Sequence, residues 1–506
     1  MKKTNYIETL NAIPAAGKTH AAITYIKETF GITKSKILYV LPTKEVINEV
    51  YNKLLEQGIE QVTKIYGDDN ISTSVQERIV DFVINQESPY ILMITNRAAM
   101  MLSDRLTGFD LVVIDEEIPS FGVTERHLPT NNEDQMASCE YFFTYISRTT
   151  TCFKGLSKLS LNHSSYKNIN KEDEIYKVFN EMFENMDKGT FDYYILDNEL
   201  DKLLDEESDT NSLHIMSIMR PTFFKQQKEV IYLGYDIENA NSSLVYKALY
   251  NYQFKQSKLE KKLRFKQYSN KVVISYIFNE RIGKQAISNN ERLQQQVKEY
   301  VENNSFNNDC LYRTNIKMKS KVKFFNSEEI MAKPHGINNP KWTQKTKIVL
   351  LNLFYTNPYE SMFFQNMGYE PADIEAGRNV NMIVQQITRS AIRHNTGETI
   401  NVLVLDQNTA LSAASAFANV TVQDSGLIPD KGPRQTRSDK LDKEFAEKCT
   451  ECKKMDYNFS RKKKITKQQQ EEWLETLKVW KALSNKLTDQ DYNKKLNKAL
   501  NATIKG

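Results

Sequence analysis

Residues 8–20 read ETLNAIPAAGKTH, and this stretch constrains the fold more than any other part of the sequence. A strand-like run leads into Gly-Lys-Thr, and a helical pattern follows at once. A loop between a strand and a helix N-terminus points backbone N–H groups at an anion, and its lysine and hydroxyl can meet phosphates and Mg²⁺. The stretch therefore predicts a phosphate-binding loop that opens a parallel α/β sheet.

The loop departs from the usual pattern because alanine stands at two positions where glycine is common, Ala12 and Ala15. Gly17 still leaves room for a phosphate to approach the backbone. The small alanine side chains fit if φ stays negative at both positions. We expect an altered but competent nucleotide loop, formed by Ala12, Ala15, Ala16, Gly17, Lys18 and Thr19.

A second motif, DLVVIDEE at residues 110–117, places Asp115 at the end of an apolar run. Ligands of parallel sheets bind at the carboxyl ends of the strands. Asp115 could hold Mg²⁺ through water together with Thr19, and Glu116 could polarise an attacking water. The two motifs together predict a nucleoside triphosphate site with ATP and Mg²⁺ as cofactors.

Two arginines near the end of the second α/β region, Arg389 and Arg393, are four residues apart in VQQITRSAIRHN. On one helix they would share a face, with Gln385 and Gln386 one turn earlier. Two guanidiniums facing a cleft suit a γ-phosphate sensor supplied by a second domain. We predict that both arginines act in catalysis with Lys18, and that both glutamines lie beside the nucleotide.

The alternation of apolar runs and helical patterns predicts two α/β units of parallel sheet. Residues 1–120 and 226–255 form the first, and residues 256–425 form the second. Residues 121–225 break the rhythm with polar stretches and aromatic clusters such as FDYYIL, and we expect a largely helical insert. Residues 426–506 are expected to form a linker and a basic helical region.

The order AIPAAGKT, YVLPTKE, MITNRAAM, VIDEE, IYLGYD, LYRTN, HGINNP and QQITRSAIR resembles the motifs of superfamily 2 (DEAD/DEAH-like) helicases, particularly divergent viral, phage or plasmid members. It spans about residues 6–406. The resemblance implies two RecA-like P-loop NTPase domains that hold ATP between them while nucleic acid crosses their upper face. GYD, where superfamily 2 has Ser-Ala-Thr, is typical of superfamily 1, so either superfamily stays open.

The resemblance also implies functional residues outside the nucleotide loop. Gly234 and Asp236 would couple hydrolysis to movement. For His335 and Asn338 in HGINNP, an ordinary Gly-Asn-Pro turn is an equally good interpretation of the local chemistry. The implied nucleic-acid contacts are Pro42, Thr43, Thr95, Arg97, Thr314, Asn315, His335 and Asn338.

The last motif of the family has glycine before its first arginine and the second arginine three positions on. Here Thr388 precedes Arg389, and Arg393 is four positions on. Which arginine reaches the γ-phosphate therefore stays open.

The expected function is an ATP-dependent nucleic-acid translocase, a DNA helicase used in replication, recombination or repair of a phage, viral or mobile genome. Its expected partner is single-stranded or forked DNA, with RNA as the alternative. Two other classes remain open. A DNA-packaging motor with a nuclease would need metal-binding acids around Asp406, and a regulatory ATPase would switch a protein-binding surface without moving a strand.

Positive charge gathers at the C-terminal end. Residues 430–506 hold 20 Lys or Arg against 12 Asp or Glu, a net +8, which leaves the rest of the chain at −4. Thr466 and Gln469 form a capping-box pattern before a helix that carries Trp473 and Trp480. We expect this region to bind nucleic acid or a replication-protein partner, with an ordinary solvated surface as the alternative.

Five scattered cysteines favour reduced thiols over a disulfide framework. The Cys449-Thr-Glu-Cys452 pair lacks a second ligand pair, so we interpret it as two incidental helical thiols rather than a zinc site. No secretory signal or membrane span is visible in the sequence. The expected location is cytoplasmic, in the host cytoplasm if the protein is viral, with no membrane partner.

Overall fold

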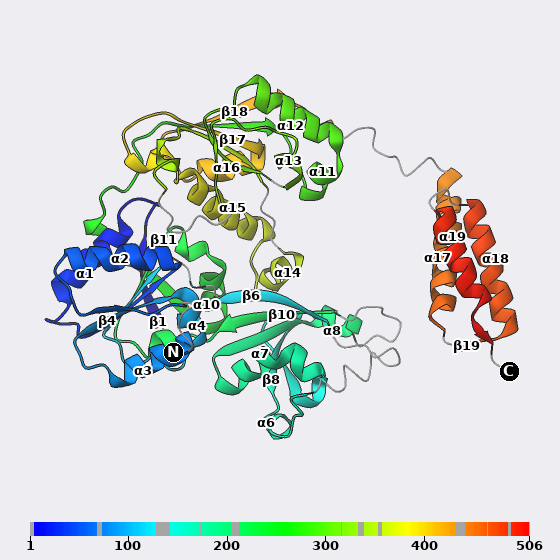
Figure 1. The fold of residues 1–506 in the computed structure, drawn as a ribbon, viewed down its shortest axis with the longest axis horizontal. Helices are drawn as coiled ribbons and strands as arrows, with labels where there is room; N and C mark the ends of the chain where they lie inside the picture. Colours follow the sequence, from blue (N-terminus) through cyan, green and yellow to red (C-terminus); the bar gives the residue numbers. More distant parts are fainter. Residues whose placement is uncertain are drawn as a thin grey trace. The chain divides into compact units, whose positions relative to one another are not determined.

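The computed structural model (Figure 1) describes most of the chain and divides it into two compact units, Met1–Pro429 and Asp430–Gly506. Each unit is treated by itself. The described residues are 5–67, 73–116, 118, 120–127, 142–172, 174–203, 212–314, 316–331, 339–352, 357–430, 441–462, 464–483 and 487–504.

The first sheet is parallel and has seven strands in the order β12-β1-β11-β5-β2-β4-β3. Its strands are β1 (Asn5–Asn11), β2 (Lys36–Leu41), β3 (Val62–Lys64), β4 (Tyr90–Thr95), β5 (Leu111–Asp115), β11 (Val230–Gly234) and β12 (Tyr252–Gln256). Its helices are α1 (Lys18–Thr29), α2 (Lys44–Glu56), α3 (Val75–Asn85), α4 (Asn96–Met101), η1 (Ile237–Asn239), α10 (Asn241–Tyr250) and η2 (Lys258–Lys262).

The strands of this sheet are apolar on both faces, which is why they appear as unbroken apolar runs in the sequence. In β2, Leu38 and Val40 belong to one core cluster, whereas Ile37, Tyr39 and Leu41 belong to the other. Helices therefore cover both faces, and the carboxyl edge of the sheet is left to carry polar side chains.

The insert contains a five-stranded antiparallel sheet in the order β6-β10-β9-β8-β7, so the prediction of a largely helical insert is wrong. All six residues of FDYYIL are buried in β9, because aromatic and β-branched side chains pack well on a pleated surface. The strands are β6 (Phe121–His127), β7 (Ile146–Thr150), β8 (Leu156–Leu161), β9 (Phe191–Leu196) and β10 (Ser212–Met219), and the helices are α6 (His163–Tyr166), α7 (Glu174–Lys188), α8 (Asp197–Leu203) and α9 (Thr222–Lys225).

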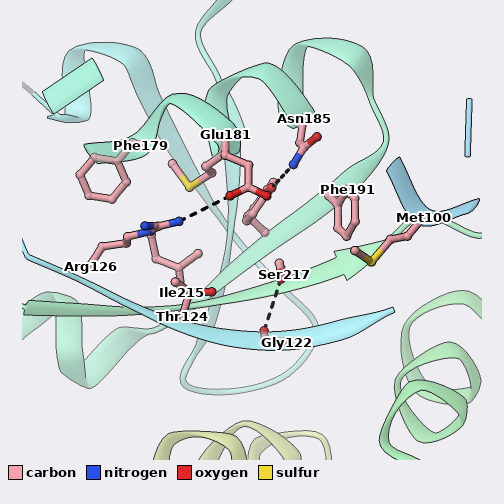
Figure 2. A pocket seen from close by; sticks show the side chains of 12 residues that line it. Met100, Gly122, Thr124, Arg126, Phe179, Glu181, Asn185, Phe191, Ile215 and Ser217 are labelled. Atoms are coloured by element: carbon pink, nitrogen blue, oxygen red, sulfur yellow. Dashed lines mark hydrogen bonds and ion pairs between the residues drawn. The ribbon is translucent and has the colours of Figure 1, made fainter. Parts of the chain in front are cut away.

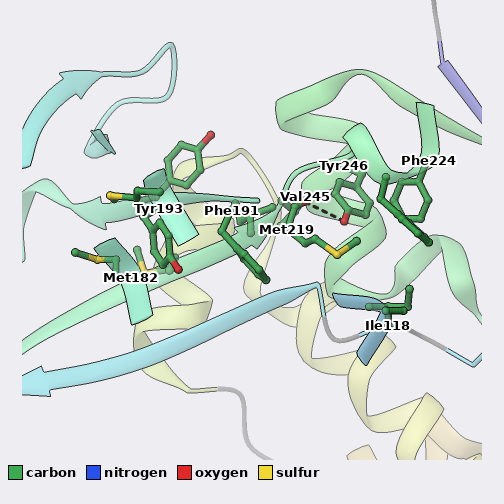
Figure 3. Packing of buried hydrophobic residues seen from close by; sticks show 14 of the residues in the cluster. Ile118, Met182, Phe191, Tyr193, Met219, Phe224, Val245 and Tyr246 are labelled. Atoms are coloured by element: carbon green, nitrogen blue, oxygen red, sulfur yellow. Dashed lines mark hydrogen bonds between the residues drawn. The ribbon is translucent and has the colours of Figure 1, made fainter. Parts of the chain in front are cut away.

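Helix α7 lies across the insert sheet and leaves a cavity of about 140 Å³ between them (Figure 2). Phe179 and Ile215 give the cavity apolar walls, and the Arg126–Glu181 ion pair, with 3.8 Å between Nη2 and Oε2, lies beside it. The core under the sheet continues into the first domain, where Met219 of β10 packs near Tyr246 of α10 (Figure 3). The insert and the first sheet therefore share one core.

The second α/β sheet is also parallel and has six strands in the order β15-β14-β16-β17-β13-β18, so the predicted α/β fold with two parallel sheets is confirmed. Its strands are β13 (Val272–Phe278), β14 (Leu311–Thr314), β15 (Glu328–Glu329), β16 (Lys347–Leu351), β17 (Ile400–Asp406) and β18 (Val420–Leu427). Its helices are α11 (Lys284–Asn289), α12 (Glu291–Asn303), α13 (Ile316–Lys319), η3 (Trp342–Gln344), α14 (Pro358–Asn366), α15 (Pro371–Ile387), η4 (Ala391–His394) and α16 (Gln407–Ala414).

Helix α14 follows β16 of the second sheet, but it packs on the insert. The ring of Phe363 stacks on Phe121 of β6 with 5.3 Å between centroids, and both Phe363 and Phe364 are fully buried. The Asn366 amide donates to the Gly155 carbonyl at 3.1 Å. The second α/β region is therefore tied to the insert through an aromatic contact.

The C-terminal unit is a helical hairpin with an additional long helix and its own small core around Trp473 and Leu477. Its elements are α17 (Leu441–Arg461), β19 (Lys464–Ile465), α18 (Lys467–Leu483), α19 (Asp489–Leu500) and β20 (Thr503–Ile504). The capping box is confirmed: Thr466 N donates to Gln469 Oε1 at 3.1 Å, and Gln469 N donates to Thr466 Oγ1 at 3.2 Å. Helices α17, α18 and α19 all lie within residues 426–506, for which we expected a linker and a basic helical region.

No helix in the described part of the chain is both long enough and apolar enough to cross a membrane.

Candidate nucleotide site

The phosphate-binding loop joins β1 to α1 and is held at its base by the neighbouring strand. Ala12 N donates to the Gly234 carbonyl at 2.9 Å, and Gly17, with φ at 92°, precedes the first residue of α1. Ala15 has φ at 65°, so the expectation that both alanines keep negative φ is wrong. An alanine in the left-handed conformation costs about 1–2 kcal/mol, and contacts of the surrounding loop must offset this cost.

The conformation of Ala15 leads to a stability prediction. Ala15→Gly should leave the free energy of unfolding unchanged or raise it, because glycine adopts positive φ without strain. Ala16→Gly, at a neighbouring buried residue with negative φ, should instead lower it by about 1 kcal/mol. Chemical denaturation of both variants would check this. Equal losses in the two variants would contradict the left-handed assignment.

The Lys18 ammonium lies over the loop, where its Nζ donates to the carbonyls of Ala12 and Ile13 at 2.9 and 3.1 Å. Burial lowers the pKa of Lys18 to about 8, and the carboxylates of Asp115 and Glu116 oppose that shift. The amine is therefore a buried cation that a phosphate would stabilise further.

Asp115 and Thr19 form the oxygen pair expected for Mg²⁺. The Thr19 hydroxyl donates to Asp115 Oδ2 at 2.8 Å, at the carboxyl end of β5 and the start of α1. Burial, with a contribution from Glu116, raises the pKa of Asp115 to about 6. A hydroxyl and a carboxylate at this edge fit a hard cation, and a bound cation would offset the cost of burying the carboxylate.

Glu116 follows β5 in a left-handed conformation with φ at 72°, and its backbone N–H donates to the Leu233 carbonyl at 2.8 Å. Non-glycine residues in this region of φ/ψ space often occur at functional sites, where the fold holds them against their preference. Its carboxylate faces the second sheet, since Glu116 Oε1 is 4.0 Å from Arg389 Nη2. This contact brings residues of the two sheets together.

The prediction that Arg389 and Arg393 share one helical face is wrong. Helix α15 ends at Ile387, and Ser390 adopts an extended conformation before Arg393 enters the short helix η4. The Ser390 hydroxyl accepts from Ile392 N, which caps η4 and fixes the break. Both arginines nevertheless lie in the connection between α15 and β17, and the charges of both act on Lys18 of the loop.

Arg389 is 5% exposed, and its Nη2 donates to Gln385 Oε1 at 3.1 Å. Burial lowers the pKa of Arg389 to about 10 and also lowers the pKa of Arg393, while Glu116 opposes both shifts. Gln385 therefore lies where it orients the guanidinium, and Gln386 is fully buried beside it. With Lys18, the site gathers three cations against the carboxylates of Asp115 and Glu116, a balance that suits a polyanion.

The predicted coupling segment connects the loop to the second sheet. A Cβ at Gly234 would lie 2.7 Å from Ile237 Cγ1, so the position requires glycine. Asp236 N donates to Asn11 Oδ1 at 2.8 Å, next to the loop. The Tyr235 carbonyl accepts from Asn381 Nδ2 of α15 at 3.3 Å. Two hydrogen bonds therefore connect this segment to the end of β1 beside the loop and to α15.

Sequence reasoning missed the segment after η2, which also contacts the loop. The Tyr268 hydroxyl donates to the Pro14 carbonyl at 2.5 Å, and Arg264 N donates to the Ala16 carbonyl at 2.9 Å. Tyr268 is 5% exposed and packs in the core of the second sheet, on which Ile13 also packs. Nothing in the local sequence marks Tyr268, because its partner is 254 residues away.

The predicted nucleic-acid contacts fall into four groups. Thr43 and Thr95 lie at the carboxyl ends of the adjacent strands β2 and β4, and their hydroxyls cap α2 and α4 by accepting from Val46 N and Ala98 N. Thr314 ends β14 and is 5% exposed. Pro42 is half-buried and Arg97 is exposed, whereas Asn315, His335 and Asn338 lie outside the described residues.

Asp406, the residue on which a nuclease would depend, acts as a helix cap. Its Oδ1 accepts from Thr409 N at 2.9 Å and its Oδ2 from Ile282 N at 3.2 Å. Within the part of the chain that the structure describes, no cluster of three or more His, Cys, Asp or Glu side chains could hold a metal ion. The packaging alternative therefore gains no support from Asp406.

A comparison with protein families agrees with this geometry for residues 8–118 of the first domain. Residues 8–118 match the DEAD/DEAH box helicase family, and no curated protein sequence matches the chain. Remote structural likenesses include apo XPD (14% identity, 83% of this chain and 97% of that chain, TM-score 0.45). S. cerevisiae Dbp5 bound to RNA and ADP BeF3 (10%, 84% and 85%, 0.36) and Mss116p bound to ssRNA and AMP-PNP (10%, 100% and 89%, 0.34) are others.

The family match covers β1, the phosphate-binding loop and Asp115, so it includes the residues that the loop geometry brings together. It confirms the prediction of an enzyme that hydrolyses ATP. The segment of the chain from residue 8 to residue 118 therefore matches a DEAD/DEAH box helicase domain.

Proposed function

We propose that the chain is an ATP- and Mg²⁺-dependent nucleic-acid translocase. The observation that carries this proposal is the 4.0 Å approach of Arg389 Nη2 to Glu116 Oε1, which links the second sheet to the catalytic edge of the first. A nucleotide held at Lys18 and Thr19 would meet Arg389 from the opposite side. A composite site of this kind makes hydrolysis sensitive to how the two sheets close.

In the proposed reaction each residue has a distinct role. Lys18 would leave its two carbonyl partners to bind the β and γ phosphates. Thr19 and Asp115 would hold Mg²⁺, which supplies positive charge against the phosphates when it is bound. Glu116 orients and polarises the attacking water. Arg389 then turns from Glu116 to the γ-phosphate. Its guanidinium would stabilise the negative charge that develops on the γ-phosphate oxygens.

The proposed coupling runs from the phosphate-binding loop to α15. When the contact between Arg389 and the γ-phosphate forms or is lost, Asn11 and the Gly234–Asp236 segment would shift. Asn381, which donates to the Tyr235 carbonyl, would pass this shift to α15 of the second domain. The nucleic-acid strand would lie along the carboxyl edges of the two parallel sheets. Thr43, Thr95 and Thr314 lie at these edges, where each ends a β-strand or caps the following helix. Relative movement of the two edges would then step the strand.

We favour single-stranded or forked DNA as the substrate and unwinding in replication, recombination or repair of a phage, viral or mobile genome as the role, with RNA as the alternative substrate. A replication-protein partner would bind the basic C-terminal unit.

Steady-state ATPase activity should rise severalfold when single-stranded DNA is added, because strand binding favours the closed arrangement in which Arg389 reaches the nucleotide. The measurement compares no nucleic acid, single-stranded DNA and single-stranded RNA at saturating ATP. A strand-displacement assay with 3′-tailed, 5′-tailed and forked duplexes would then give the polarity. Stimulation by neither nucleic acid would contradict a motor and favour the regulatory ATPase.

A further inference from the structure

The C-terminal unit separates its charges onto different surfaces. Helix α17 turns Cys452, Asp456 and Phe459 into the core, at helical spacing of three and four residues. The opposite side of the helix and its end carry a set of exposed residues that we call the basic stripe. The basic stripe consists of Lys453, Lys454, Tyr457, Arg461 and Lys462.

One exposed acid of the same helix, Glu451, lies within three residues of Lys453 and Lys454, and the four cations of the basic stripe outnumber it. Asp456 is buried, accepts from Trp473 Nε1 at 2.8 Å and pairs with Lys495, so it serves the core. The exposed acids of α18 include Glu475, which pairs with Lys478 at 3.8 Å. Within the described residues of the unit, Lys453, Lys454 and Lys462 form no ion pair. Their charge is therefore available to an external anion.

An exposed aromatic ring lies within the basic stripe. Tyr457 is 37% exposed, and the Arg461 guanidinium lies 4.1 Å from the centre of its ring. Lys453, Tyr457 and Arg461 are spaced four residues apart, so they extend over about 12 Å along one side of the helix. A row of cations around an aromatic side chain matches the repeating phosphates and bases of a single strand.

We propose that the basic stripe of α17 is a binding site for single-stranded nucleic acid, with the lysines and Arg461 on phosphates and Tyr457 against a base. A duplex keeps its bases stacked inside, so it would use the cations but not the ring. The site needs no nucleotide. It would hold the strand in the neighbourhood of the proposed motor and raise its effective concentration. This inference goes beyond the proposed function and does not require ATP-driven movement.

The test uses the full-length chain without nucleotide and a fluorescein-labelled single strand, with anisotropy measured over a range of salt concentrations. The stripe variant carries Lys453→Gln, Lys454→Gln and Lys462→Gln. The control variant carries Lys467→Gln, Lys478→Gln and Lys498→Gln, which remove the same charge from exposed residues elsewhere in the unit. Circular dichroism would establish that both variants keep the helical content of the parent.

The stripe variant should lose about tenfold or more in affinity, and the slope of log affinity against log salt should flatten by about 2, at roughly 0.7 for each lost phosphate contact. The control variant should stay within about twofold of the parent. Tyr457→Ala should weaken single-strand binding and leave duplex binding unchanged. Equal losses in the two lysine variants, or equal effects of Tyr457→Ala on single strands and duplexes, would overturn the inference.

ATPase measurements on the same proteins separate this inference from the proposed function. Basal activity without nucleic acid should be the same in the stripe variant and the parent, because no residue of the stripe belongs to the nucleotide site. If the parent binds strands through the stripe and its ATPase is not stimulated, the motor proposal fails and the inference stands.

Discussion

Lys18→Ala should lower ATP hydrolysis by about 100-fold or more in kcat/KM. The Lys18 ammonium is a buried cation at the head of α1, and burial lowers its pKa to about 8. No other residue of the loop from 12 to 19 carries a charge, so nothing in the loop replaces it. Removing a charged donor aimed at developing negative charge costs roughly 10²–10³ in rate in comparable sites. Steady-state ATPase with and without nucleic acid would measure the loss.

A matched control for this prediction is Lys34→Ala. Lys34 pairs with Glu229 at 2.5 Å on the same domain but takes no part in the loop, so hydrolysis should stay within about twofold of the parent. Lys18→Ala should also unfold at nearly the parent's temperature, because loss of the two hydrogen bonds is offset by removal of the cost of burying the charge. Retention of most activity by Lys18→Ala would show that nucleotide is bound elsewhere.

The parallel sheets could be predicted because burial on both faces forces long apolar runs, such as KILYVL in β2 and INVLVLD in β17. The loop and Asp115 could be predicted for a related reason: phosphate chemistry limits the residue types, and the carboxyl edge of the sheet fixes their place. The 2.8 Å contact between Thr19 and Asp115 follows directly from that arrangement.

The insert could not be predicted as a sheet because its aromatic runs have no clear periodicity. FDYYIL is buried at every position, so neither a helical nor an alternating pattern is visible. The break between Arg389 and Arg393 depends on the Ser390 cap, and the spacing of four residues suggested a continuous helix. Tyr268 and its contact with Pro14 depend on tertiary packing over a long sequence separation, which no local pattern encodes.

Arg389→Ala should lower the maximal, nucleic-acid-stimulated rate of ATP hydrolysis by about 1,000-fold, the lower end of the range for an arginine that reaches the γ-phosphate. Its guanidinium is buried, held by Gln385 at 3.1 Å, and 4.0 Å from Glu116, so it is already positioned at the catalytic edge. ATP affinity, measured with a fluorescent ATP analogue, should change by only a few-fold, since Lys18 and the loop remain.

Arg389→Lys and Arg393→Ala distinguish positioning from charge. Lysine keeps one positive charge but loses the planar fork, so Arg389→Lys should remain strongly impaired while it preserves the attraction to Glu116. Arg393 lies after the Ser390 break in η4, whereas Arg389 Nη2 already lies 4.0 Å from Glu116 at the catalytic edge, so Arg393→Ala should lose less activity. A larger loss in Arg393→Ala would assign the γ-phosphate to Arg393 and leave Arg389 to orient Glu116, because only the arginine that meets developing charge should dominate the maximal rate.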